Sequence, residues 1–197
     1  LDPEIKKVAD LKGKSVSIGA PGSGVYFNAI DVLEAAGLTE KDIKPQYQSF
    51  ADSTDALKDG KIDAAFIVAG APTPAITELC TTNAAYLVPI DGDVAEKLMK
   101  ECPFYTEYTV PAKTYAGQKE DVKTVTVKAT LIVSASASEE DVYKLTAAIF
   151  DNIDAITAEN GKGAEISIEN ATSGMTVPFH KGAAKYSAEK GIDVKVD

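Results

Sequence analysis

Short apolar runs alternate with amphipathic stretches along the first half of the chain. The pattern predicts strands at residues 15–18, 46–50, 62–70 and 85–90. Helices are predicted at residues 23–36, 53–60, 73–79 and 91–100. The run at 62–70 is apolar enough for a parallel strand buried on both faces. This β-α-β-α-β-α-β series predicts an α/β fold, a parallel or mixed sheet flanked by helices.

The pattern changes after Cys102. Residues 103–121 are rich in tyrosine, threonine and proline without a helical period, so we expect an ordered connection there. Residues 122–136 alternate apolar and polar positions, which predicts one long strand. Ser138 is placed to cap a helix of about twenty residues with one apolar stripe, and a short helix is expected near the C-terminus.

Composition places the chain among ordinary globular proteins with one large domain or two small ones. Its 197 residues carry a net charge of −10, and every basic residue is a lysine. Because arginine supplies the planar fork that recognises phosphate and guanine, nucleic-acid binding is not expected. No apolar run approaches the roughly 18 residues that cross a membrane. The polar opening residues show no cleavable signal, so an exported protein would be seen here in mature or trimmed form.

The cysteines and the histidine give no metal site. Cys80, Cys102 and His180 are too few for a convincing zinc centre, and no metal or cofactor is expected. The two cysteines are interpreted as buried or half-buried thiols, with a disulfide as the alternative in an exported protein.

A glycine-rich turn, Gly19-Ala20-Pro21-Gly22-Ser23-Gly24, joins the first predicted strand to the first helix. Backbone N–H groups at a helix N-terminus, with the helix dipole behind them, favour an anion such as a carboxylate or phosphate. Ser23 can cap the helix or donate its hydroxyl to that anion. The spacing matches neither a P-loop nor a dinucleotide fingerprint. The alternative is a strand-to-helix turn that holds nothing.

No catalytic constellation is visible. Ser23 lies in Gly-Ser-Gly without a neighbouring base, and His180 is interpreted as a structural histidine. Acidic residues at 91, 93 and 139–141 fall at predicted helix starts, where capping explains them. We therefore expect a protein that is not an enzyme.

Several longer strings point to a family. "ADLKGKSVSIGAPGSG", "DALKDGKIDAAFIVAGAPTPAITEL", "CPFYTEYTVPAKTYAGQKEDVKTVTVKATLIV" and "PFHKGAAKYSAEKG" closely resemble the TAXI family, the substrate-binding proteins of TRAP-type secondary transporters. The resemblance implies a type II periplasmic-binding-protein fold, two lobes that close on a small solute. It implies that residues 9–112 form the complete second lobe, 113–122 the crossover or hinge, and 123–197 the C-terminal part of an incomplete first lobe.

The resemblance also implies an extracytoplasmic receptor that binds a small carboxylate such as glutamate and delivers it to TRAP permease subunits in the membrane. Tyr26 is expected either to stack over the ligand or to pack in the lobe. The alternative function is an effector-sensing domain of an intracellular regulator. The candidate ligand-binding residues are Gly22, Ser23, Gly24, Val25, Tyr26, Phe50, Ala51, Ala69, Gly70, Ala71 and Tyr115.

Overall fold

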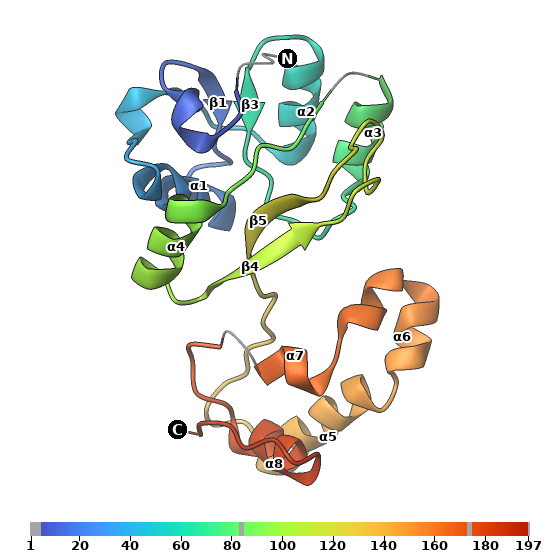
Figure 1. The fold of residues 1–197 in the computed structure, drawn as a ribbon. Coiled ribbons are helices and arrows are strands. Elements are labelled where there is room, and N and C mark those ends of the chain that lie inside the picture. Colours follow the sequence, from blue (N-terminus) through green and yellow to red (C-terminus); the bar gives the residue numbers. More distant parts are fainter. Residues whose placement is uncertain (1–4, 83–84, 173–174, 197) are drawn as a thin grey trace. The chain divides into compact units, whose positions relative to one another are not determined.

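The computed structural model describes residues 5–82, 85–172 and 175–196 and divides into two compact units at the Thr126–Val127 peptide (Figure 1). The first unit holds η1 (Val8–Leu11), β1 (Ser15–Ser17), α1 (Gly24–Ala35), η2 (Glu40–Asp42), β2 (Lys44–Gln46), α2 (Phe50–Lys58), β3 (Ala64–Ala65), α3 (Pro74–Thr82), α4 (Gly92–Glu101), β4 (Tyr105–Val110) and β5 (Val122–Val127), whose last residue crosses the boundary. The second unit holds α5 (Glu139–Phe150), α6 (Ile153–Glu159), η3 (Gly161–Glu165), α7 (Ile168–Thr172) and α8 (Lys181–Glu189). Within the described ranges, no helix is long and apolar enough to cross a membrane.

A three-stranded parallel sheet organises the first unit. Its strand order is β2-β1-β3, with Val16 of β1 opposite Pro45 on one side and Ala64 on the other. The central strand is buried, since Val16 and Ile18 are fully inaccessible to solvent. The parallel α/β architecture expected from the sequence is therefore confirmed for the first three strands.

Helix α1 lies where the apolar period predicted it. Ser23 is its N-cap and accepts a hydrogen bond from the N–H of Tyr26, and Gly37 follows its end with a φ of 77°. That left-handed backbone suits glycine, which has no Cβ to clash. Ala29 and Leu33 form the centre of its buried face. The local signals of this strand–turn–helix are all confirmed.

Two buried serines attach α2 to β1. The hydroxyls of Ser17 and Ser53 lie 2.7 Å apart, and the Ser53 hydroxyl donates to the carbonyl of Ser49. Ser49 also caps α2, because its hydroxyl oxygen accepts from the N–H of Asp52. The strand predicted at 46–50 and the helix start predicted at residue 53 are therefore wrong. The strand ends at Gln46 because Ser49 starts the helix.

Two other predicted strands are shorter or missing. The run at 62–70 contributes only the two-residue β3, and Val68 is 37% exposed rather than buried on both faces. In the sheet as described, β3 is an edge strand that pairs with β1 alone. Residues 85–90 form no strand. The N–H of Ile90 bonds to the carbonyl of Lys123, but Pro89 has no N–H to continue a ladder.

The connection expected at 103–121 contains a strand instead. β4 pairs with β5, and the backbone between them closes as a hydrogen-bonded loop. The buried phenol of Tyr105 joins β4 to α1, since it donates to Asp31 at 2.9 Å and accepts from Asn28 at 2.5 Å. Burial raises the pKa of Tyr105. The long strand predicted at 122–136 ends at Val127, and the residues after it are not paired as a strand.

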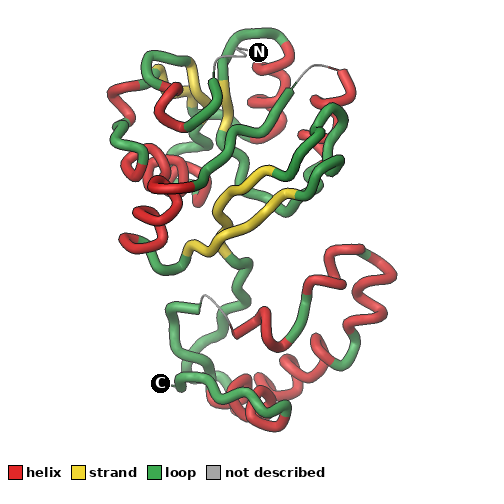
Figure 2. The backbone as a smooth tube through the Cα atoms, viewed as in Figure 1, coloured by secondary structure: helices red, strands yellow, loops and turns green. Residues whose placement is uncertain are grey.

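Beyond β5, the second unit consists of helices and loops in its described part (Figure 2). Ser138 caps α5 as predicted, by accepting from the N–H of Asp141. The prediction of a single twenty-residue helix is wrong, because the helix is interrupted at Asp151 and Asn152 before α6 begins. The Asn152 amide donates to the carbonyl of Ala148 at 2.8 Å, a local side-chain bond that competes with helical continuation.

Helices α5 and α8 pack closely around aromatic rings. The Tyr186 ring stacks on Phe150 at 5.7 Å and meets Tyr143 edge-on at 5.9 Å. His180 is the N-cap of α8: Nδ1 accepts from the N–H of Gly182, and Nε2 lies 3.2 Å from the Ala137 carbonyl. These partners assign the proton to Nε2 and confirm a structural role for the histidine.

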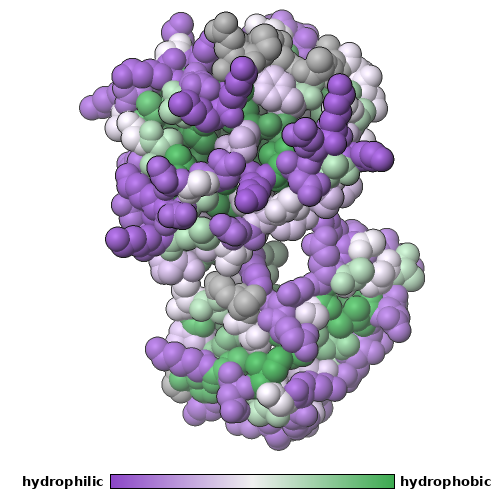
Figure 3. All heavy atoms as spheres, viewed as in Figure 1, coloured by the Kyte–Doolittle hydropathy of each residue, from purple (hydrophilic) through white to green (hydrophobic). Residues whose placement is uncertain are grey.

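The second unit buries few apolar side chains. Val142 and Tyr186 are the only members of the buried apolar core in its described part. Leu131 and Ile132 are 66% and 79% exposed in the segment that follows β5, and Leu145 is exposed on α5. Figure 3 shows apolar side chains gathered on the visible surface of this unit. A unit with so little buried apolar surface gains little hydrophobic stabilisation.

Candidate functional site at the carboxyl edge of the parallel sheet

The sheet topology brings three loops to one edge. Because β1, β2 and β3 are parallel, the segments that leave their carboxyl ends all emerge on the same side. From β1 the chain continues to β2, which pairs with one edge of β1. It then crosses to β3, which pairs with the other edge, so strand order reverses at β1. Right-handed crossovers then place α1 and α2 on opposite faces, and Figure 1 draws them on opposite sides of β1 and β3. Ligands of open α/β sheets bind in the crevice at such a switch point.

The glycine-rich turn follows β1, the central strand. Gly19 and Gly22 have φ values of 83° and 75°, so the turn uses left-handed backbone at both positions. A Cβ on Gly19 would lie 2.7 Å from the Cβ of Val25, which leaves no room for a side chain. Gly22 and Gly24 are exposed, and a Cβ on either would meet nothing within 4 Å. The turn therefore presents open main chain to solvent.

Two backbone donors at the start of α1 are free to bind a ligand. Within the described residues, the N–H groups of Gly24 and Val25 have no hydrogen-bond partner, whereas Tyr26 N–H donates to the Ser23 hydroxyl oxygen at 3.2 Å. These are first-turn donors, which have no carbonyl within their own helix. The hydrogen bond from Tyr26 N–H uses one lone pair of the Ser23 hydroxyl oxygen, so the Ser23 O–H can still donate to a ligand. The helix dipole of the twelve-residue α1 adds positive potential at the same place.

The other two strand ends carry the remaining predicted residues. Phe50 and Ala51 are in the first turn of α2, whose own N-terminus points to the same edge of the sheet. Ala69 and Gly70 are exposed after β3, and Ala71 is half-buried. The predicted residues 22–25, 50–51 and 69–71 thus lie at the three adjacent strand ends. Contact between them and a ligand stays a prediction.

Tyr26 packs within the first unit, which was one of its two predicted roles. Its hydroxyl donates to a Glu40 carboxylate oxygen at 3.2 Å, and the Tyr47 hydroxyl donates to the other oxygen. The hydrogen bond to Glu40 raises the pKa of both Tyr26 and Tyr47. The sequence did not single out Glu40 or Tyr47, because Tyr47 fell inside the strand predicted at 46–50, whereas the observed strand ends at Gln46.

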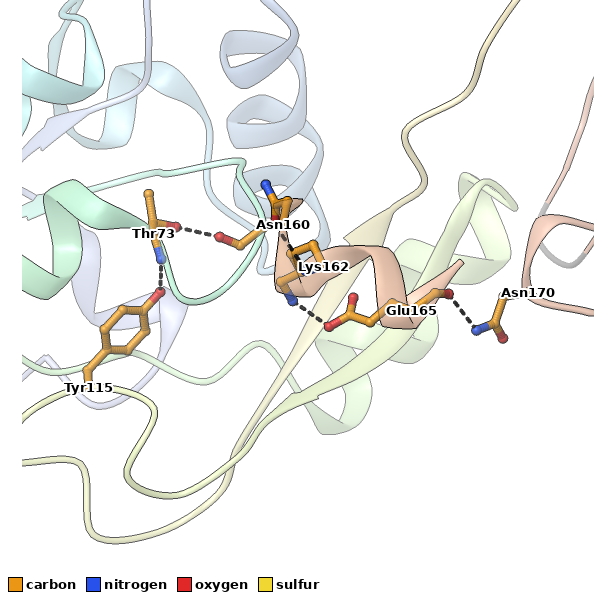
Figure 4. A network of polar contacts seen from close by, with 7 residues as sticks. Thr73, Tyr115, Asn160, Lys162, Glu165 and Asn170 are labelled. Atoms are coloured by element: carbon orange, nitrogen blue, oxygen red, sulfur yellow. Dashed lines mark hydrogen bonds and ion pairs between the residues drawn. The ribbon is translucent and has the colours of Figure 1, made fainter. Parts of the chain in front are cut away.

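Tyr115 is buried rather than open to the edge. Its side chain is 4% exposed, and its hydroxyl accepts a hydrogen bond from the N–H of Thr73 at 2.9 Å (Figure 4). Thr73, the first residue of the helix predicted at 73–79, therefore belongs to the neighbourhood of the site. Residues 113–122, expected to cross between lobes, lie inside the first unit as the loop between β4 and the start of β5.

The described residues give no support for metal binding or thiol chemistry. Across the described ranges, no group of three or more His, Cys, Asp or Glu side chains is placed to hold a metal ion. Cys80 and Cys102 are free and half-buried, so the predicted thiols are confirmed and the disulfide alternative is not. Burial raises the pKa of both thiols, which disfavours the reactive thiolate.

The topology and the site define an α/β protein whose parallel sheet offers free backbone donors at its carboxyl edge. A model of the NMT1-like family matches residues 2–191, and the chain belongs to that family.

The chain is also similar to a solved structure of the periplasmic aliphatic sulphonate binding protein SsuA from Escherichia coli. The two share 20% sequence identity at a TM-score of 0.47, over 94% of this chain and 51% of that one. The chain therefore spans about half the length of that structure. The finer resemblance to the TAXI family stays a prediction.

Proposed function

We propose that this chain is the ligand-binding part of an extracytoplasmic solute receptor that binds a small carboxylate such as glutamate. The observation that carries the proposal is the pair of unpartnered N–H groups on Gly24 and Val25, at a glycine turn that follows the central strand. Backbone donors at a helix N-terminus bind anions without a charged side chain. Membership of the NMT1-like family is compatible with this function.

A carboxylate suits the donors that the edge offers. Three helices, α1, α2 and α3, begin where a strand of the sheet ends, so their dipoles add positive potential at one edge. The chain has no arginine for a bidentate clamp. Main-chain N–H groups and the Ser23 O–H would therefore hold the carboxylate, and a lysine or another part of the protein would supply any cationic partner.

We further propose that the receptor works with TRAP permease subunits, that residues 9–112 are one complete lobe, and that residues 123–197 include part of another. Exposed Leu131, Ile132 and Val133 support the incomplete second part, since three consecutive apolar side chains are left without cover in the described structure. Strands apolar on both faces are typical of the interior of a parallel sheet. Closure on the solute would be driven by its higher affinity for the closed form.

A thermal-shift comparison tests the proposed function. We expect succinate or L-glutamate to raise the Tm of the chain, with about 2.7 kcal/mol of stabilisation at a concentration one hundred times Kd. Succinamide, which has the same carbon skeleton without charge, should give no shift. An equal shift with succinamide, or none with any carboxylate, would contradict the proposal. A Tm shift with taurine alone, which carries a sulphonate group, would mean that the anion site binds a sulphonate and not a carboxylate.

A further inference from the structure

The loop between β4 and β5 is held in a fixed shape by its own hydrogen bonds. The Gln118 amide donates to the carbonyls of Val110 and Glu120, and its oxygen accepts from the N–H of Tyr115. The backbone N–H of Lys113 donates to the carbonyl of Gln118, and Lys113 takes a φ of 66°. Gln118 thus ties both ends of the loop together and fixes the backbone from which the Tyr115 side chain extends.

Tyr115 connects this loop to the segment that follows β3. Its hydroxyl accepts from the N–H of Thr73 at 2.9 Å, and the Thr73 hydroxyl donates to the carbonyl of Gly70 at 2.9 Å. Figure 4 shows the phenol directed at Thr73. Tyr115 and Thr73 are 4% and 8% exposed, so water does not readily replace either partner.

Thr73 stands at the junction between the candidate site and α3. Gly70 and Ala71 precede it at the carboxyl end of β3, and Pro74 begins the helix. A donor at a helix start has no carbonyl in its own helix, so an external acceptor is needed to satisfy it. The phenol is that acceptor, and it comes from a segment 42 residues away in the chain.

We propose that Tyr115 is a positioning residue: through Thr73 it fixes residues 69–73 in the conformation that receives the solute. Tyr115 sets affinity without contacting the ligand, because its ring is buried and its hydroxyl bonds to the protein. This inference rests on the proposed function and deepens it. The ligand contact expected for Tyr115 from the sequence is replaced by an indirect role.

The test compares Tyr115→Phe with Tyr108→Phe in the whole chain. Tyr108 lies on β4 and is half-buried, and its hydroxyl has no hydrogen bond in the described structure. Tyr108→Phe therefore controls for the loss of a tyrosine hydroxyl in itself. We expect Y115F to weaken L-glutamate binding about tenfold, the effect of one lost hydrogen bond, while Y108F binds like the unmodified chain. Amide hydrogen exchange should accelerate at Thr73 in Y115F, with β1 amides unchanged.

A second variant keeps the test open if Y115F folds poorly. Thr73→Val keeps the shape of the side chain and removes the hydroxyl that donates to Gly70. It should weaken L-glutamate binding to a similar degree. Acceleration of exchange throughout the first unit would indicate a general stability role and overturn the proposal.

The two hypotheses fail in different ways. If the unmodified chain binds L-glutamate and Y115F binds equally well, Tyr115 does not position the site and the proposed function survives. If Thr73 exchange is unchanged in Y115F, the positioning role is overturned whatever the ligand. If the unmodified chain binds neither L-glutamate nor succinate, the carboxylate function fails, and the effect of Tyr115 on affinity fails with it.

Discussion

Replacement of Gly182 by alanine is expected to destabilise the second unit by about 3 kcal/mol, near the upper end of the usual cost of overpacking. A Cβ at this position would lie 2.3 Å from the carbonyl oxygen of Glu139 and 2.7 Å from the backbone nitrogen of Tyr143. Backbone atoms of α5 cannot move aside as a flexible side chain would, so α8 must move away from α5. That movement exposes Val142 and Tyr186.

The opposing effect of helix propensity is smaller. Alanine is preferred to glycine by about 1 kcal/mol inside a helix, and by less near an end such as that occupied by Gly182. The clash therefore decides the sign. Urea unfolding, together with amide hydrogen exchange in α5 and α8, measures the loss.

Gly161→Ala is the matched control for G182A. A Cβ on Gly161 meets nothing within 4 Å, and its φ lies outside the left-handed region. Its free energy of unfolding should change by less than about 0.5 kcal/mol. If G182A were as stable as G161A, the close packing of α8 on α5 would be wrong.

Replacement of Gly24 by leucine is expected to weaken solute binding at least tenfold while leaving the fold intact. A Cβ on Gly24 has no atom within 4 Å, so the protein accommodates a side chain there. The added leucine would cover the N–H groups of Gly24 and Val25, which a bound carboxylate needs. Kd for L-glutamate should rise at least tenfold, or about 1.4 kcal/mol, by isothermal titration calorimetry.

Ala36→Leu controls for the added bulk, because it builds the same side chain at the other end of α1. This variant should bind L-glutamate like the unmodified chain. Equal binding by G24L and the unmodified chain would place the ligand elsewhere and remove the glycine turn from the site.

The strand–turn–helix from β1 to α1 could be predicted because its signals are local. The apolar run at 15–18, the capping Ser23 and the terminal Gly37 lie close together in the sequence. They correspond to β1, to the N-cap of α1 and to the end of α1. Strand lengths could not be predicted in the same way. Apolar sequence at 62–70 and 122–136 indicates strand, but a ladder needs a partner that the pattern does not identify.

The same distinction between local signals and tertiary contacts applies to the candidate site. Its position could be predicted, because parallel strands bring their carboxyl ends to one edge and the loops follow from chain order. The bond between Tyr115 and Thr73 could not, since it joins two loops through tertiary packing. The same holds for Tyr26, whose hydroxyl finds Glu40 fourteen residues along the chain.

In the proposed site, main-chain N–H groups of the glycine turn bind the carboxylate of a small solute. Amide proton–nitrogen correlation spectra during titration with L-glutamate test it most directly. We expect saturable shifts that are largest at Gly22, Gly24 and Val25, with Gly37 at the far end of α1 unchanged. Saturation of the protein without shifts at Gly24 and Val25, or with the largest shifts away from the carboxyl edge, would contradict it.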